Sequence, residues 1–187
     1  MARIRYVLPA EIDEPEMREW LEKSIRDGKP GPEIQAIRAH SPGVMRSFTR
    51  TREWIFHSGA LDYELKEMLR GYIATSAGCV YCSNQGVARD WQEDRDQLDE
   101  ILHHRRSEAF SDREKAALEY ADAIMWDPAS VDDALWERLR THFDEEQLVE
   151  LGYWIGFTFG GQRWLKTLDA RQGELAAAME EAETPVA

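Results

Sequence analysis

The stretch EMLRGYIATSAGCVYCSNQGVARDW, residues 67–91, decides how the rest of the chain is interpreted. It contains the only two cysteines of the chain, Cys79 and Cys82, in a Cys-x-x-Cys spacing. Ser76-Ala77-Gly78 interrupts a helical pattern just before this pair, and the pattern restarts at Cys79. We therefore predict that the cysteines lie at the junction of two helices and form a thiol–disulfide redox site.

Three features favour an activated thiol at this junction. The pKa of a free cysteine thiol is about 8.5, so a thiol that reacts at neutral pH needs a stabilised thiolate. A helix amino terminus supplies this stabilisation because it favours negative charge. Both cysteines fall in the first turn of the predicted helix, and their three-residue offset places both sulfur atoms on one face. Glu67 lies twelve residues before Cys79 on the preceding helix, which we expect to pack antiparallel, and is the candidate proton acceptor.

Two other interpretations of the pair remain open. The cysteines could be two small buried apolar side chains, or they could form half of a metal site, which needs further ligands. His103 and His104 are adjacent and cannot both face one site from a helix, and we expect both on a solvated surface beside Arg105 and Arg106. We therefore expect no metal, and the absence of a phosphate-binding glycine loop predicts no organic cofactor.

Composition narrows the class of partner. The chain has 187 residues, 43% of them hydrophobic, which is enough for one domain or one domain with an extension. Its net charge of −13 argues against nucleic acid or an anionic membrane as a partner. The amino-terminal sequence shows no signal pattern, and the most apolar run, residues 151–161, is too short and polar to span a bilayer. We expect a cytoplasmic protein.

The whole chain has helical periodicity and no strand pattern, so we predict an all-α fold. Ser111 followed by Glu114 is a capping-box signature for one of the helices. The predicted helices span residues 11–27, 33–40, 44–58, 61–75, 79–91, 94–103, 112–126, 131–142 and 145–168. The last one is apolar nearly all the way round, which predicts burial in the core and at a subunit interface.

Four motifs stand out along the chain: LKEML with Glu67, CVYC with the cysteine pair, FSDREKAALEYADAI, and FDEEQLVELGYWIGFTFGGQRW, which has Gln162-Arg163 near its end. In these motifs the chain resembles the carboxymuconolactone decarboxylase family, in its alkylhydroperoxidase D-like branch. The resemblance covers roughly residues 42–168. It divides the chain into a helical extension (1–41), a family core (42–170) and a polar tail (171–187).

The resemblance implies a compact helical fold assembled as a homotrimer or homohexamer. It also implies a peroxidase or disulfide-reductase activity without a cofactor. In that scheme a small-molecule peroxide oxidises Cys82 to a sulfenic acid, Cys79 resolves it to a disulfide, and Glu67 takes part in the proton relay. A dithiol reductant, either a small molecule or a protein, then restores the pair.

One position departs from the peroxidase pattern. The family's peroxidases carry a histidine four residues after the second cysteine, and Gly86 occupies that position here. Tyr81, Asn84 and Gln85 are candidate supporting residues, and His57 could reach the site from a neighbouring helix. The relay from carboxylate through histidine to thiol is therefore incomplete.

We predict a thiol-dependent peroxidase or disulfide oxidoreductase that reduces alkyl hydroperoxides. Two alternatives come from different classes. The family's lactone decarboxylases are lyases that act without the cysteine pair, so the pair argues against that reaction. A non-catalytic redox-sensing or assembly protein would form the disulfide without turnover, and the missing histidine keeps this alternative open.

Overall fold

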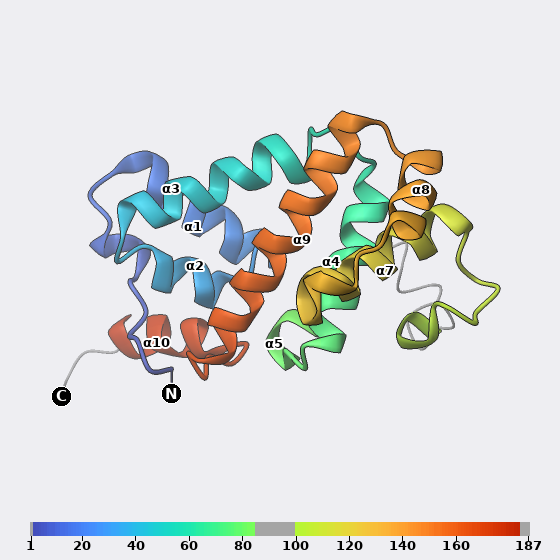
Figure 1. The fold of residues 1–187 in the computed structure, drawn as a ribbon. Coiled ribbons are helices and arrows are strands. Elements are labelled where there is room, and N and C mark those ends of the chain that lie inside the picture. The colour runs from blue at the N-terminus through green and yellow to red at the C-terminus, as the bar shows by residue number, and fades with distance from the viewer. Residues whose placement is uncertain (1, 85–99, 184–187) are drawn as a thin grey trace. The chain divides into compact units, whose positions relative to one another are not determined.

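The structure is a computed structural model that describes residues 2–84 and 100–183. Within these ranges all regular structure is helical and no strand occurs, which confirms the predicted all-α class (Figure 1). None of the helices in the described ranges has the length and apolar character needed to cross a membrane. The chain divides into two compact units, residues 1–52 with 164–187 and residues 53–163.

The first unit is built from short helices, four of which begin at a proline. Its elements are η1 (Pro9–Glu11), α1 (Pro15–Asp27), α2 (Pro32–Arg38), α3 (Pro42–Thr51) and α10 (Glu174–Glu183). Proline at the first helical position costs nothing, because its missing N–H would be unpaired there. A small apolar cluster holds the unit together: Val7, Ile12, Met17, Leu21, Ala36, Met45 and Leu175.

The carboxy-terminal segment belongs to this first unit through buried and backbone contacts. The Gly173 N–H donates to Glu33 at 2.8 Å, and the Arg3 N–H donates to the Leu168 carbonyl at 2.8 Å. Leu175 of α10 is fully buried. The predicted polar tail therefore contains a packed helix, because one apolar residue of its first turn enters the core.

The second unit carries the cysteines. It contains most of the π-helical segment η2 (Arg52–Phe56), then α4 (Tyr63–Ser76), α5 (Val80–Ser83), η4 (Ile101–His103), α7 (Asp112–Trp126), η5 (Pro128–Ser130), α8 (Asp133–His142) and α9 (Glu145–Lys166) as far as Arg163. Its core is formed by apolar residues of α4, α7, α8 and α9. The Ser111–Glu114 capping box forms as predicted and starts α7.

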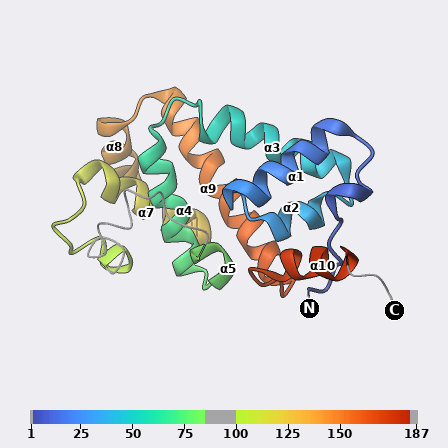
Figure 2. The same cartoon turned by 180° about the vertical axis from the view of Figure 1, so that it is seen from behind.

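Helices α4 and α9 pack directly against each other in this unit, as both views show (Figure 1, Figure 2). The buried Trp154 indole of α9 donates to the Lys66 carbonyl of α4 at 3.0 Å. The same indole stacks on Phe56, with ring centroids 4.8 Å apart. Helix α4 is thereby joined to α9, and its last turn leads into the cysteine pair.

Candidate active site

The turn between α4 and α5 places Cys79. Gly78 adopts a left-handed conformation with φ of 62°, which only glycine enters without steric cost. The Cys79 N–H donates to the Ala74 carbonyl at 2.8 Å, and the Gly78 N–H donates to the Thr75 carbonyl at 3.1 Å. These two bonds form a Schellman motif, the standard end of an α-helix at glycine. The predicted break at residues 76–78 is therefore a defined helix end that aims Cys79 at α5.

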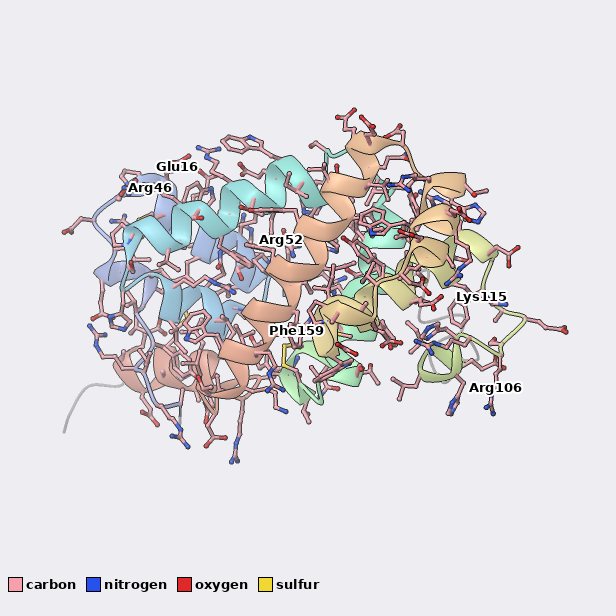
Figure 3. The ribbon with its side chains drawn as sticks, viewed as in Figure 1. Glu16, Arg46, Arg52, Arg106, Lys115 and Phe159 are labelled. Atoms are coloured by element: carbon pink, nitrogen blue, oxygen red, sulfur yellow. A yellow bond between two sulfur atoms is a disulfide. The ribbon has the colours of Figure 1, made fainter. Side chains whose placement is uncertain are left out.

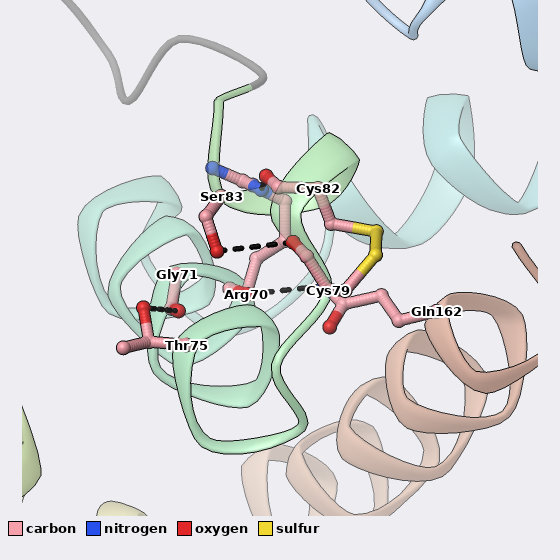
Figure 4. Close-up of a disulfide and its surroundings, with 7 residues drawn as sticks. All are labelled: Arg70, Gly71, Thr75, Cys79, Cys82, Ser83 and Gln162. Atoms are coloured by element: carbon pink, nitrogen blue, oxygen red, sulfur yellow. Dashed lines mark hydrogen bonds between the residues drawn. A yellow bond between two sulfur atoms is a disulfide. The ribbon is translucent and has the colours of Figure 1, made fainter. Parts of the chain in front are cut away.

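The two cysteines are joined by a disulfide (Figure 4). Cys79 is the N-cap of α5 and Cys82 lies in its single described turn, so their Cα atoms are 5.3 Å apart. Both side chains are almost completely buried, with exposed fractions of 1% and 2%. The remainder of the predicted helix, up to residue 91, lies outside the described residues.

Glu67 reaches the pair through an arginine. Its carboxylate accepts two hydrogen bonds from the Arg70 guanidinium, at 2.9 Å from Nε and 2.8 Å from Nη2. The Arg70 Nη1 donates to the Cys82 carbonyl at 2.9 Å. Glu67, Arg70 and Cys82 are all buried, so this carboxylate–guanidinium–carbonyl chain is shielded from water. A charged fork with both ends occupied is among the stronger hydrogen-bond arrangements in proteins.

Arg70 is the residue that the sequence interpretation missed. It follows Glu67 by three positions, a spacing that brings two side chains together on one helix face. The same spacing is common on solvent-exposed helices, so it does not by itself indicate a site. The signal was the position of Arg70 among the apolar residues of α4, next to a carboxylate already singled out.

A glutamine of α9 completes the surroundings of the disulfide. The Gln162 Nε2 donates to the Arg70 carbonyl at 3.1 Å, and Figure 4 shows this side chain extending from α9 toward α4 and the cysteine pair. Gln162 is 6% exposed, and its Oε1 has no hydrogen-bond partner. The sequence identified Gln162 only as part of a family motif, without a role.

The supporting residues proposed from the sequence are placed unevenly. Tyr81 is half-buried in α5, next to Cys82, and Asn84 is exposed at the end of that helix. Gln85, like Gly86, lies outside the described residues. His57 is exposed and contacts the rings of Phe56 and Tyr63, at 4.9 and 6.0 Å between centroids.

The prediction that His104 is solvated is wrong. Its side chain is 2% exposed, whereas His103 is exposed, and Arg106 extends outward at the edge of the fold (Figure 3). The His104 Nδ1 lies 3.1 Å from the Ile101 carbonyl, and the ring packs edge-on against Tyr72 at 5.3 Å. Burial lowers the pKa of His104 below its ordinary value.

Asp122 of α7 binds to the neighbours of His104. It accepts a hydrogen bond from the Tyr72 hydroxyl, and one of its oxygens lies 3.3 Å from Arg105. Burial, with this hydrogen bond, raises the pKa of Tyr72. No group of three or more His, Cys, Asp or Glu side chains suited to a metal ion occurs among residues 2–84 and 100–183.

With this geometry in place, comparison with known proteins identifies the segment around the cysteines. The sequence model of the Carboxymuconolactone decarboxylase family matches residues 42–123. The matched residues include α3, α4, the cysteine pair and most of α7. The predicted resemblance to the family is confirmed for this segment.

A curated relative and two solved structures extend the comparison. The uncharacterized protein YnjA of Escherichia coli (strain K12) is 36% identical over 112 residues, which cover 58% of this chain and 61% of YnjA. The alkylhydroperoxidase AhpD core protein from Ralstonia eutropha JMP134, an uncharacterized peroxidase-related protein, superposes with a TM-score of 0.77 at 20% identity, over 92% of this chain and 93% of that one. The debrominase Bmp8 superposes at 0.71 and 21% identity, over 91% and 93%.

These comparisons establish the fold and leave the reaction open. The match spans less than two thirds of the length of YnjA. The two solved structures carry names from different chemistries, one peroxidase-related and one a debrominase, at similar structural distance. A fold is shared by proteins of many functions, so the reaction has to be argued from the site.

Proposed function

We propose that this protein is a thiol-dependent peroxidase and disulfide oxidoreductase that reduces alkyl hydroperoxides with Cys79 and Cys82. The observation that carries the proposal is the disulfide between the only two cysteines of the chain, held beside the buried Glu67–Arg70 pair. Buried polar groups converging on a reactive pair are typical of catalytic sites. The match of residues 42–123 to the family model supports the same assignment, because the resemblance to this family implied the activity.

The proposed cycle consumes one hydroperoxide and two thiols. The Cys82 thiolate attacks the distal oxygen of ROOH, the S–O bond forms, the O–O bond breaks, and the alkoxide leaves as ROH after taking a proton. The Cys79 thiolate then attacks the sulfenic sulfur of Cys82, forming the disulfide and releasing water. A dithiol reductant returns two electrons by thiol–disulfide exchange and leaves as its own disulfide.

Glu67 is the proton acceptor in this proposal, and Arg70 is a positioning residue. In the disulfide form both carboxylate oxygens of Glu67 are bound by Arg70. Proton exchange between Glu67 and a Cys82 thiol therefore requires the guanidinium to release one oxygen. Arg70 also holds the Cys82 carbonyl, so it couples the position of the carboxylate to that of the attacking residue.

The experiment is dithiol-coupled consumption of cumene hydroperoxide by the wild type, Cys82→Ser and Cys79→Ser. We expect both variants to lose turnover. Cys79→Ser should accumulate a sulfenic acid that dimedone traps at residue 82, whereas Cys82→Ser should not. The chain has no other cysteine to give background. Unchanged turnover in either variant contradicts the assignment.

A second candidate is a non-catalytic redox sensor, which the near-complete burial of both sulfur-bearing side chains favours. Burial limits access of a reductant to the disulfide. A sensor would form and lose the disulfide with a change in oligomeric state and without sustained peroxide consumption. Activity on a carboxylated lactone that survives replacement of both cysteines would instead support the lyase class.

The proposal extends to assembly and compartment. Helix α9 exposes Val149 and Tyr153 one turn apart, with exposed fractions of 74% and 51%, and Trp54 of the same unit is exposed by 67%. Exposed apolar side chains at helical spacing are typical of a protein interface. We expect homotrimers or homohexamers in the cytoplasm. Light scattering after size-exclusion chromatography would measure the number of subunits.

A further inference from the structure

Two buried oxygen atoms on α9 have no hydrogen-bond partner. They are Oγ1 of Thr158 and Oε1 of Gln162, and each of these side chains is only 6% exposed. A buried polar atom without a partner costs free energy, so each one calls for an explanation, such as a bound water or ion or a role in the chemistry of the site. The two residues are one helical turn apart and lie on the same face of α9.

This face of α9 is directed at the turn of α4 that carries Glu67. Trp154 donates to the Lys66 carbonyl and Gln162 donates to the Arg70 carbonyl. Thr158 lies one turn from each of them, so it faces the α4 turn between these two carbonyls. Both side chains therefore lie on the side of α9 that faces α4, and Gln162 belongs to the surroundings of the disulfide (Figure 4).

The hydrogen-bonding character of the two atoms is defined. The Arg70 carbonyl can only accept, so the NH₂ group of Gln162 must face it and Oε1 must face the other way. Oε1 can only accept a hydrogen bond, whereas the Thr158 hydroxyl can donate one. The pair thus offers an acceptor and a donor about one helical turn apart.

We infer that Gln162 and Thr158 bind the O–O–H group of the hydroperoxide, an inference that rests on the proposed function. A hydroperoxide carries a donor on its distal oxygen and an acceptor on the adjacent proximal oxygen. Gln162 Oε1 accepts from the distal O–H, and the Thr158 hydroxyl donates to the proximal oxygen. This arrangement orients the distal oxygen toward Cys82.

The same contacts assist the bond-breaking step. When the Cys82 thiolate attacks the distal oxygen, that oxygen keeps its hydrogen and becomes the sulfenic acid. The O–O electron pair passes to the proximal oxygen, which takes a proton and leaves as the alcohol. Negative charge therefore develops on the atom that Thr158 contacts, where a fixed donor lowers the barrier.

The test compares Thr158→Val, which removes the hydroxyl and keeps the shape, with Thr158→Ser, which keeps the hydroxyl. Reduced protein is mixed with cumene hydroperoxide, and thiol loss is measured by alkylation and mass spectrometry over a single turnover. We expect Thr158→Val to react about tenfold more slowly and Thr158→Ser to stay near the wild type, because one hydrogen bond to a charged group is lost. Gln162→Met should slow the reaction by a similar factor.

A second measurement separates binding from damage to the fold. Dithiothreitol reduction of the Cys79–Cys82 disulfide involves no O–H group of a peroxide, so Thr158→Val should leave its rate unchanged. Its melting temperature should not fall either, because the deleted hydroxyl has no partner in the protein. Gln162→Met loses a bond to Arg70, so Thr158→Val decides the matter if that variant does not fold.

The outcomes distinguish this inference from the proposed function. If the wild type reduces cumene hydroperoxide and Thr158→Val does so equally fast, the inference is wrong and the proposed function stands. Equal slowing of the peroxide and dithiothreitol reactions also overturns it, because the effect is then not specific to the peroxide. If the wild-type cysteines do not react with cumene hydroperoxide, both proposals fail together.

Discussion

Two buried ion pairs start from neighbouring residues of α4 and connect to different parts of the second unit. Lys66 binds Glu150 of α9 at 2.9 Å and also donates to the Ile55 carbonyl. Glu150 in turn accepts from the backbone N–H groups of Ala60 and Leu61. This pair joins α4, α9 and the segment before α4, and both of its charges are satisfied by groups far apart in the sequence.

The second pair, Glu67 with Arg70, is local. Both residues belong to α4, and the Arg70 guanidinium reaches α5 through the Cys82 carbonyl. Consecutive residues point about 100° apart on a helix, so Lys66 and Glu67 face different neighbours. The two pairs look alike in burial and charge. The Lys66–Glu150 pair connects distant parts of the fold, whereas the Glu67–Arg70 pair is linked to the disulfide.

The largest expected effect comes from breaking the first pair with Lys66→Met. This leaves the Glu150 carboxylate buried without its cation, which costs about 3 to 5 kcal/mol of the free energy of unfolding. Urea denaturation measures the loss. The double variant Lys66→Met/Glu150→Gln should recover part of it, because the unpaired charge is then removed. A loss of less than about 1 kcal/mol would mean that the pair does not stabilise the fold.

Breaking the second pair should affect the cysteines more than the fold. Arg70→Met leaves the buried Glu67 carboxylate and the Cys82 carbonyl without their donor, which we expect to cost about 3 kcal/mol of stability. Glu67→Gln and Arg70→Met should both change the pH dependence with which iodoacetamide alkylates the reduced protein.

Lys66→Met is the matched control for this alkylation measurement, because it removes a neighbouring buried charge that does not contact the pair. Its alkylation profile should follow that of the wild type in the folded protein. Arg70→Lys tests the geometry, since lysine keeps the charge and loses the two-pronged contact. If all these variants shift the profile equally, the two ion pairs are not functionally distinct.

A smaller effect is expected at Gly59. A Cβ atom there would collide with the carboxylate of Glu150, so Gly59→Ala must displace that group from the Ala60 N–H. We expect a loss of about 1 to 2 kcal/mol by urea denaturation. Gly71→Ala on α4 is the control: a Cβ there meets nothing within 4 Å, and alanine should stabilise the helix by up to about 1 kcal/mol. Equal effects at both positions would contradict this explanation.

The helices could be predicted from the sequence because their signals are local. The range expected for α7 matches the observed Asp112–Trp126, since a capping box fixes its start and Asp127-Pro128 its end. The break after α4 was predicted at Ser76-Ala77-Gly78 from an equally local signal. The cysteine pair and Glu67 could be identified because they lie at fixed distances from one another within one short segment of the sequence.

The polar network around the cysteines could not be predicted in the same way. Gln162 and Arg70 are 92 positions apart, and nothing in the sequence shows that α9 crosses α4 at that residue. The Glu67–Arg70 spacing is equally compatible with a solvated helix face. Packing decides which of these side chains are buried, and packing is a long-range property.

The burial of His104 was missed because the spacing of buried residues in this segment differs from that of an α-helix. Every third residue is buried in the segment that starts at η4: Ile101, His104, Ser107 and Phe110. A 3₁₀ turn has three residues per turn, so Ile101 and His104, which caps the end of η4, share a face. The expectation for His104 used the charge of its neighbours, and the true period places those neighbours outward.

The smallest predicted effect is at His104, and it is a change in how the free energy of unfolding depends on pH. Because burial lowers its pKa in the folded state below the ordinary 6.5, the unfolded chain binds a proton first as the pH falls. Its contribution is therefore fully present above pH 6.5 and declines as the pH falls below it, at no more than about 1.4 kcal/mol per pH unit. Asp122 and Glu119 oppose this shift, and Arg105 adds to it. Urea denaturation between pH 8 and pH 5.5 should show a shallower slope for His104→Gln than for Arg70→Met or the wild type; an unchanged slope would assign the pH dependence to the carboxylates instead.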